Sequence, residues 1–342
     1  MTGTGIVLVL VEAEPEEMST LSLEAITFAR GLAETGGATV HALVVGDVPA
    51  SGLDELSAHG AAVLHQVGDP RLDAYSAAAW ASCVVDAVRA HAPSVVLAPA
   101  SPRGNEVLAH VAARLDLRMA ANVTEVTSAQ LGGIGAAAAS GETALVVRRQ
   151  VMGGAVLEEL DLVGSPALFT MAGHAVEHST VASPVAVQVV ATAPVSLTDA
   201  DLVARVRRTV PVASSGTDLT RARVVVGGGR GVGGPDQFDE LIALAERLGG
   251  ALGVSRVVTS LGWRPHHEQV GQTGSRITPD VYLACGISGA IQHWAGCSSA
   301  KTIIAVNTDP EAPMVTKADY AVVGDLHQVV PAISAELDAR HH

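Results

Sequence analysis

The chain has 342 residues, enough for about two domains of ordinary size. Hydrophobic residues make up 48% of it and charged residues only 16%, a composition that excludes an intrinsically disordered chain. The formal net charge of −14 argues against a protein that binds nucleic acid mainly through phosphate contacts.

The cysteines Cys83, Cys285 and Cys297 form no CxxC pattern. This spacing argues against a disulfide scaffold or a zinc ribbon and favours a reducing compartment. The first apolar run, residues 6–11, has no basic segment before it and is too short for a signal peptide or a membrane span. We expect a cytoplasmic protein without direct membrane insertion.

In the first half of the chain, apolar runs typical of buried strands alternate with segments of helical periodicity. Strands are predicted at residues 6–11, 39–45, 61–66 and 94–98. Helices are predicted at residues 21–34, with Ser19 or Thr20 as the N-cap, and at 74–90 and 106–115. This alternation predicts a parallel sheet covered by helices on both faces.

The pattern changes from about residue 122, because predicted strands follow one another without long helices. These strands are residues 122–127, 143–150, 155–162 and 167–171, with glycine-rich gaps at 131–135 and 153–154. We interpret the region as an antiparallel extension of the first domain. Prolines and polar residues in 182–211, followed by 213–216, indicate the segment between domains. The predicted boundaries are 1–205 for the first domain, 206–221 for the linker and 222–342 for the second domain.

The second domain is predicted to be a doubly wound, Rossmann-like fold, which makes the whole chain an α/β protein of two domains. Its strands are predicted at residues 223–226, 281–284, 302–306 and 320–323, and its helices at 237–248, 290–295 and 326–337.

A glycine-rich segment opens this domain. Gly229-x-Gly231-x-x-Gly234 lies between a strand and a helix, as in the dinucleotide fingerprint. That fingerprint also requires an acid about 20 residues later, but residues 253–256 contain none. Arg256 could meet a 2′-phosphate instead, which keeps binding of NADP open. A turn without a ligand and a surface arginine explain the same residues.

Other loops at predicted strand ends carry polar groups. Residues 269–274 offer neutral hydrogen-bonding groups, although a solvated turn is the simpler explanation in isolation. Residues 286–293 predict a loop entering a helix, with Ser288 as the N-cap and free N–H groups suited to a pyrophosphate. His293 could equally be a buried histidine bonded to backbone. Asn307 fits turn chemistry and Asp325 an N-cap. Because the ends of parallel strands line one crevice, these loops together predict dinucleotide binding.

No hydrolytic motif competes with that interpretation. The sequence contains no GxSxG, no HExxH and no Walker A lysine, and its only lysines are Lys301 and Lys317. His266, His267 and Glu268 are spaced wrongly for two ligands on one helical face, so we expect no metal site.

The second domain carries a series of motifs, of which QVGQTG together with GISGAIQH at this spacing is highly specific. They are GGRG at 228–231, Ser255-Arg256, QVGQTG at 269–274, GISGAIQH at 286–293, NxDPEAP at 307–313, ADY at 318–320 and Asp325-Leu326. This series resembles the alpha subunit of electron-transfer flavoproteins. The resemblance covers the second domain closely and the first domain only in outline.

The resemblance implies a non-covalent FAD held mostly by the second domain. It also implies a heterodimer with a beta subunit, in which the first domain is a scaffold. Such a pair carries electrons from flavoprotein dehydrogenases, for example the acyl-CoA dehydrogenases of fatty acid β-oxidation, to a membrane quinone reductase or another acceptor. The chain would thus be an electron carrier and not a substrate-converting enzyme.

By the same resemblance, Arg256 and His293 flank the isoalloxazine ring and Thr273 lies near its N5. A nearby cation and hydrogen-bond donor should raise the flavin potential, because reduced flavin gains negative charge. The residues implied to line the FAD site are Arg230, Ser255, Arg256, Val270, Gly271, Gln272, Thr273, Ser288, Gly289, Ala290, Ile291, Gln292, His293, Asn307 and Asp325.

The sequence departs from the family at Ser260 and Asn122, where an aspartate is common, which leaves the fine tuning of the potential and the partner contacts open. One alternative function is an NADP-dependent oxidoreductase that uses residues 229–234 and Arg256, with His293 as its only obvious proton donor. Another is a member of the same family that pairs with a nicotinamide-binding beta subunit and bifurcates electrons.

Overall fold

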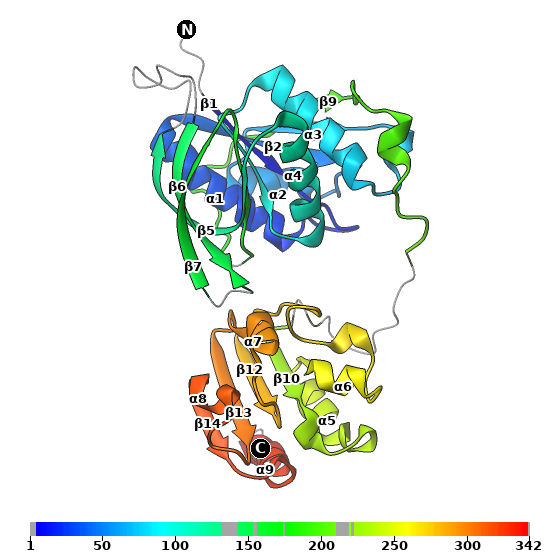
Figure 1. Cartoon of the computed structure of the whole chain (residues 1–342), viewed down its shortest axis with the longest axis vertical. Coiled ribbons are helices and arrows are strands. Elements are labelled where there is room, and N and C mark those ends of the chain that lie inside the picture. Colours follow the sequence, from blue (N-terminus) through cyan, green and yellow to red (C-terminus); the bar gives the residue numbers. More distant parts are fainter. Residues whose placement is uncertain are drawn as a thin grey trace. The chain divides into compact units, whose positions relative to one another are not determined.

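The computed structural model describes residues 5–130, 143–152, 156–173, 175–209, 219 and 222–340. The chain forms two compact units, residues 1–151 with 157–209, and residues 152–156 with 210–342 (Figure 1). The predicted gaps at 131–135 and 153–154, and the predicted interdomain residues 213–216, lie outside the described residues.

The first unit is built on a nine-stranded sheet in the order β7-β6-β5-β8-β4-β1-β2-β3-β9. The strands are β1 (Gly5–Leu10), β2 (Ala38–Val45), β3 (Val63–Val67), β4 (Val95–Pro99), β5 (Met119–Gln130), β6 (Thr143–Val151), β7 (Val156–Gly164), β8 (Ala167–Met171) and β9 (Gln188–Thr192). The helices are α1 (Thr20–Gly36), α2 (Gly52–His59), α3 (Ala77–His91) and α4 (Pro102–Leu115).

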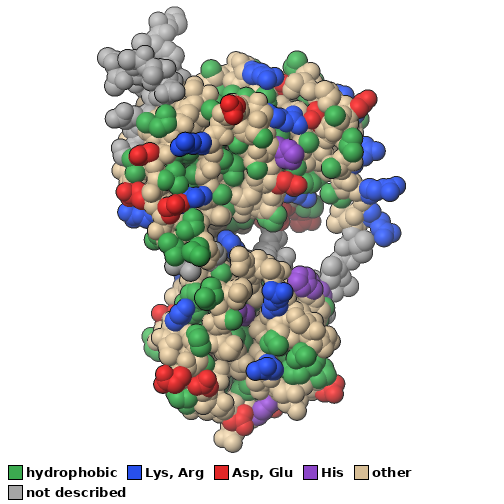
Figure 2. All heavy atoms as spheres, viewed as in Figure 1, with side chains coloured by type: hydrophobic (Ala, Val, Ile, Leu, Met, Phe, Trp, Pro, Cys, Tyr) green, Lys and Arg blue, Asp and Glu red, His purple; other side chains and the backbone are tan. Residues whose placement is uncertain are grey.

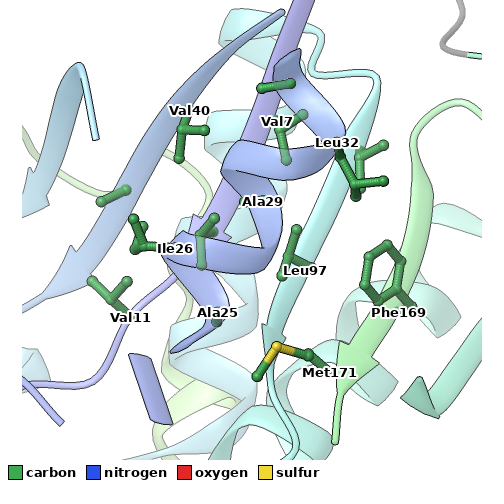
Figure 3. Packing of buried hydrophobic residues seen from close by; sticks show 14 of the residues in the cluster. Val7, Val11, Ala25, Ile26, Ala29, Leu32, Val40, Leu97, Phe169 and Met171 are labelled. Atoms are coloured by element: carbon green, nitrogen blue, oxygen red, sulfur yellow. The ribbon is translucent and has the colours of Figure 1, made fainter. Parts of the chain in front are cut away.

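Alternating side chains of the buried strands feed two separate cores, because successive residues of a strand point to opposite faces of the sheet. Val7 and Val9 pack with α1 on one face, while Leu8 and Leu10 pack with α3 and α4 on the other. Figure 3 shows the first of these cores, where Ile26 of α1 lies over the sheet. The predicted α/β layer architecture is confirmed.

The extension of this sheet is only partly antiparallel. Strand β5 pairs antiparallel with β6, as predicted. However, β8 lies between β4 and β5 and runs parallel to both, so it belongs to the main sheet. The predicted interdomain stretch 182–211 also contains β9, which pairs parallel with β3. Prolines flank β9 and hid it from the pattern analysis. A strand of only five residues can nevertheless pair at the edge of a sheet.

The segment that follows β9 is anchored to helices α3 and α4. The Asp86 carboxylate accepts hydrogen bonds from the backbone N–H groups of Val195 and Ser196. Asp201 is buried and accepts from Ser82 and Arg114, the latter at 2.6 Å. These bonds fix the chain to the first unit well beyond its last strand.

The second unit is built on a five-stranded sheet in the order β11-β10-β12-β13-β14, in which all neighbours are parallel. The strands are β10 (Val224–Gly228), β11 (Ala251–Val254), β12 (Val281–Cys285), β13 (Thr302–Asn307) and β14 (Tyr320–Val323). The helices are α5 (Asp239–Arg247), α6 (Arg256–Ser260), α7 (Ile291–Cys297), α8 (Pro313–Lys317) and α9 (Leu326–Arg340).

Both faces of this sheet are covered as well. Val225 and Ala284 belong to the core that includes Cys297 of α7 and Met314 of α8. Val226 and Leu283 belong to the core beneath α5, α6 and α9. The doubly wound fold is therefore confirmed, although β11, α6 and α8 are too short to have been predicted from periodicity.

Acidic and basic side chains are interspersed on the face of the first unit that Figure 2 shows. Several form surface ion pairs, such as Arg149 with Glu158 at 2.6 Å. None of the described helices combines the length and the apolar composition needed to cross a bilayer.

Candidate cofactor site

Most of the loops predicted to bind a dinucleotide follow strands of the second sheet at its carboxyl edge, whereas residues 269–274 follow a 3₁₀ turn and reach the end of β11 through a bridge between Gln269 and Val254. Arg230 follows β10, Ser255 follows β11, and Ser288 follows β12. Asn307 ends β13, and Asp325 comes two residues after β14. Consecutive strands β10 and β11 lie on one side and β12 to β14 on the other, which places the topological switch point between β10 and β12. Open α/β sheets bind ligands at such a point.

The glycines after β10 serve close packing between two loops. A Cβ on Gly229 would lie 2.1 Å from the Gly286 carbonyl oxygen, and one on Gly231 would lie 2.7 Å from the Gly286 Cα. The Gly231 N–H also donates to that carbonyl, at 3.0 Å. The motif lies between a strand and a helix, as predicted, although α5 begins only at Asp239, after two 3₁₀ turns.

The loop 269–274 packs against α7. The Gln272 N–H donates to the Gln292 carbonyl at 2.8 Å. Gly271 has a φ of +142° and Gly296 faces it so closely that a Cβ on Gly296 would lie 2.3 Å from the Gly271 nitrogen. These contacts bring two of the predicted site segments together.

A chain of side-chain hydrogen bonds runs beneath this loop. The Thr259 hydroxyl donates to Gln269 Oε1 at 2.6 Å, and Gln269 Nε2 donates to the Thr273 hydroxyl at 3.1 Å. Gln269 is buried, whereas Thr273 is exposed. Since Thr273 accepts from Gln269, its own hydroxyl proton is free to donate toward a ligand.

Helix α7 begins at Ile291, with Ala290 before it, so Ser288 is not its N-cap. Instead, the Ser288 carbonyl accepts from the Met314 N–H at 3.1 Å. Gly289 has a φ of +82° and lies against the Met314 backbone, where a side chain would collide. The chain therefore turns sharply before the helix and leaves Ser288, Ala290 and Ile291 exposed.

His293 is a buried residue near the start of α7. Its Nε2 is 2.7 Å from the hydroxyl of Tyr282, which is wholly buried on β12. Burial lowers the pKa of His293 to about 4, although the nearby Val270 backbone favours the protonated ring. The imidazole is therefore neutral at pH 7. Its Nδ1 has no partner in hydrogen-bonding geometry among the described residues.

The edge also carries polar and cationic groups without partners. The Ser255 hydroxyl is buried and has no hydrogen bond within the described part of the chain. The exposed side chains of Arg230 and Arg256 form no ion pair with any described acid. A buried polar atom without a partner is costly in a folded protein. Hydroxyl, imidazole and guanidinium donors, together with an exposed apolar side chain at Ile291, suit an anionic cofactor with a flat ring system, as FAD is.

The remaining predicted residues differ in how closely they join this group. The Asn307 side chain donates to the Ile287 carbonyl at 3.0 Å, which ties β13 to the loop after β12. The Asp325 carboxylate accepts from the His327 N–H at the start of α9, as predicted for an N-cap. It forms no hydrogen bond to another predicted site residue within the described ranges.

Glu268, beside His266 and His267, is engaged by an arginine. Glu268 forms a bidentate pair with Arg264, at 2.8 and 2.6 Å, and does not turn toward the histidines beside it. Within the described ranges, no three His, Cys, Asp or Glu side chains are arranged to hold an ion.

Sequence reasoning missed Tyr282, Thr259 and the buried role of Gln269. Tyr282 is hidden in an apolar strand, where it is indistinguishable from a core aromatic. Only the smallness of Gly227 on the neighbouring strand hinted at a bulky partner, since a Cβ there would lie 2.3 Å from the Tyr282 hydroxyl.

Two family models match the chain. Residues 7–201 match the electron transfer flavoprotein domain, and residues 218–298 match the electron transfer flavoprotein FAD-binding domain. The second match contains the loops after β10, β11 and β12. The resemblance and the FAD cofactor predicted from sequence are thus confirmed.

Relatives that match over nearly their whole length indicate the same family. The electron transfer flavoprotein subunit alpha of Mycobacterium leprae is 36% identical over 335 residues, covering 97% of this chain and 98% of the relative. The protein of that name from Mycobacterium tuberculosis (strain CDC 1551 / Oshkosh) is 37% identical, covering 98% of each. The one from Bacillus subtilis is 33% identical, covering 96% of each. Because these matches span nearly the whole of both chains, the protein belongs to the electron transfer flavoprotein alpha subunit family.

Proposed function

We propose that the residues at the carboxyl edge of the second sheet hold FAD, and that the chain works as an electron carrier rather than as an enzyme that converts a substrate. The observation that carries this proposal is the pair of buried polar atoms without partners among the described residues, Ser255 Oγ after β11 and His293 Nδ1 in α7. When bound, FAD supplies the redox chemistry by accepting electrons from one protein and passing them to another. The chain's own residues bind and orient it.

Each part of the cofactor meets a different kind of group in this proposal. The guanidiniums of Arg230 and Arg256 offer positive charge to the pyrophosphate or the ring, and Ser255 offers a hydroxyl. Thr273 offers a proton held in place by Gln269. Neutral His293 offers one ring nitrogen. The other proposed contacts are Val270, Gly271, Gln272, Ser288, Gly289, Ala290, Ile291, Gln292, Asn307 and Asp325.

An alpha subunit implies a beta subunit, with which this chain would form a heterodimer. We propose flavoprotein dehydrogenases as electron donors and a membrane quinone reductase as acceptor, in the cytoplasm. The cytoplasmic location is supported by Cys83, Cys285 and Cys297, all free thiols. The boundaries 1–205, 206–221 and 222–342 remain our prediction for the domains, and limited proteolysis would test them.

An NADP enzyme finds less support. The space that a phosphate would need beside Gly229 and Gly231 is occupied by the loop at Gly286. Arg256 alone would then have to account for the preference for a phosphate.

The first test is the visible absorption spectrum of the full chain, purified alone and co-expressed with the beta subunit. We expect a flavin spectrum in the complex and release of FAD on denaturation. A colourless complex after addition of FAD would overturn the proposal.

The second test is Arg256→Ala in the complex, with Arg340→Ala on α9 as the matched control. Loss of a charge-assisted contact should weaken FAD binding about tenfold or more, or lower its reduction potential. Arg340 pairs with Glu336 on an exposed helix and should have no effect. Equal affinity and equal potential in the two variants would remove Arg256 from the site.

A further inference from the structure

Tyr282 and His293 form an isolated buried pair beneath the proposed FAD site. The Tyr282 hydroxyl is wholly buried, and within the described residues its only hydrogen-bond partner is His293 Nε2, at 2.7 Å. The phenol fits there because Gly227, on the adjacent strand β10, has no side chain. The sequence thus builds a pocket for one hydroxyl next to one imidazole.

Both groups are neutral at pH 7. Burial raises the pKa of Tyr282 well above its usual value, and burial lowers the pKa of His293 to about 4. The phenol therefore keeps its proton, and the imidazole carries a single proton on either Nδ1 or Nε2.

The two tautomers differ in whether every buried donor of the pair has an acceptor. If Nε2 carried the proton, it would donate to the phenol, and the hydroxyl proton of Tyr282 would be buried without an acceptor. If Nδ1 carries the proton, the hydroxyl donates to Nε2 and both groups are satisfied. The second arrangement leaves an N–H at Nδ1, the atom that lacks a partner in hydrogen-bonding geometry among the described residues.

We propose that Tyr282 is a positioning residue that holds His293 in the Nδ1–H tautomer and so presents a hydrogen-bond donor to FAD. This inference rests on the proposed function of the site. Without the Tyr282 hydroxyl, the ring could take either tautomer or turn over, and the site would offer an acceptor where FAD requires a donor.

The tautomer can be measured without FAD. In the full chain labelled with ¹⁵N-histidine, long-range ¹H–¹⁵N spectra distinguish a protonated from an unprotonated ring nitrogen, and loss of one signal set in His293→Asn assigns it. We expect Nδ1–H in the wild type and a shift toward Nε2–H or a mixture in Tyr282→Phe. Tyr320→Phe, which removes the same atom from an exposed tyrosine on β14, should leave the signals unchanged. A wild-type chain with Nε2–H would overturn the proposal directly, even if Tyr282→Phe failed to fold.

The consequence for FAD is measured in the complex with the beta subunit. Tyr282→Phe should weaken FAD binding about three- to tenfold relative to Tyr320→Phe. If Tyr282→Phe leaves the tautomer unchanged while His293→Asn weakens FAD binding, Tyr282 has no positioning role, but His293 still belongs to the FAD site. If His293→Asn leaves FAD binding unchanged, the proposed contact of His293 with FAD fails, whatever the tautomer.

Discussion

Both units carry polar side chains at or near the carboxyl ends of parallel strands, but these side chains meet different partners. In the first unit, the Ser101 hydroxyl donates to the Glu12 carboxylate and accepts from the Gly104 N–H at 2.8 Å. Thr170 donates to Asn105 at 2.8 Å and accepts from the Asn122 N–H at 3.0 Å. In the second unit, Ser255 and His293 each keep a buried polar atom without a partner.

This difference separates an edge that is complete in itself from one that needs a ligand. The first unit also has two buried unpaired atoms among the described residues, His65 Nδ1 on β3 and Trp80 Nε1 on α3, but neither belongs to the segments predicted to bind the cofactor. Two sheets with the same layering can therefore differ in function through a few hydrogen bonds.

The largest expected effect breaks the loop packing of the second unit. Gly229→Ala places a Cβ 2.1 Å from the Gly286 carbonyl oxygen and should lower the free energy of unfolding by about 3 kcal/mol and release FAD. Gly234→Ala, in the same motif with nothing within 4 Å, is the control. Urea unfolding followed by Trp263 and Trp294 fluorescence, in a Trp80→Phe background, measures it. Loss of FAD at unchanged stability would instead mean that Gly229 contacts phosphate.

Acid should destabilise both units, because burial lowers the pKa of His65 and of His41 in the first unit and that of His293 in the second. Burial, with smaller contributions from His91 and His41, lowers the pKa of His65 to about 4. Below pH 6.5, His65 is protonated in the unfolded chain but still neutral in the folded one. The free energy of unfolding therefore falls as the pH drops from 6.5 toward 4. The loss should be about 1–3 kcal/mol in the first unit.

His65→Leu should flatten that pH dependence for the first unit, reported by Trp80, and leave the second unit unchanged. His110→Leu, at an exposed position of α4, is the control. An equally steep pH profile in His65→Leu would show that other groups govern the acid response.

The smallest effect tests the comparison most directly. Ser101→Ala removes a helix cap and the bond to Glu12, and should cost about 1 kcal/mol whether FAD is present or not. Ser255→Ala removes a hydroxyl without a partner and should cost nothing without FAD, yet weaken FAD binding about three- to tenfold. Thermal unfolding with and without FAD gives both values. A loss of stability in FAD-free Ser255→Ala would mean that its hydroxyl has a partner within the protein.

Sequence patterns predicted most of the strands and long helices because alternating and helical periodicities are local. Position in the sheet is not local, which is why β8 was assigned to the antiparallel extension and β9 was missed. Asn122 has a φ of +59°, at an irregularity of β5 that no periodicity could indicate.

The site was predicted unevenly for similar reasons. Motif resemblance supplied the loop residues, and the parallel sheet brings their loops to one edge. The role of Gly229 was left open, since a glycine that admits phosphate and one that admits another loop look alike in sequence. Motif resemblance missed Tyr282, because the hydroxyl of a strand tyrosine matters only once its neighbour across the core is known.

The anchoring of residues 195–206 has a practical consequence for dividing the chain. Asp86 and Asp201 hold this segment, and the Val206 N–H donates to the Tyr75 carbonyl at 2.8 Å. A truncated version of the first unit that stopped at residue 182 would lose β9 and leave the edge of β3 open to pairing with other chains. One that stopped after residue 206 would keep β9 and the anchoring bonds, and so would keep the edge of β3 covered.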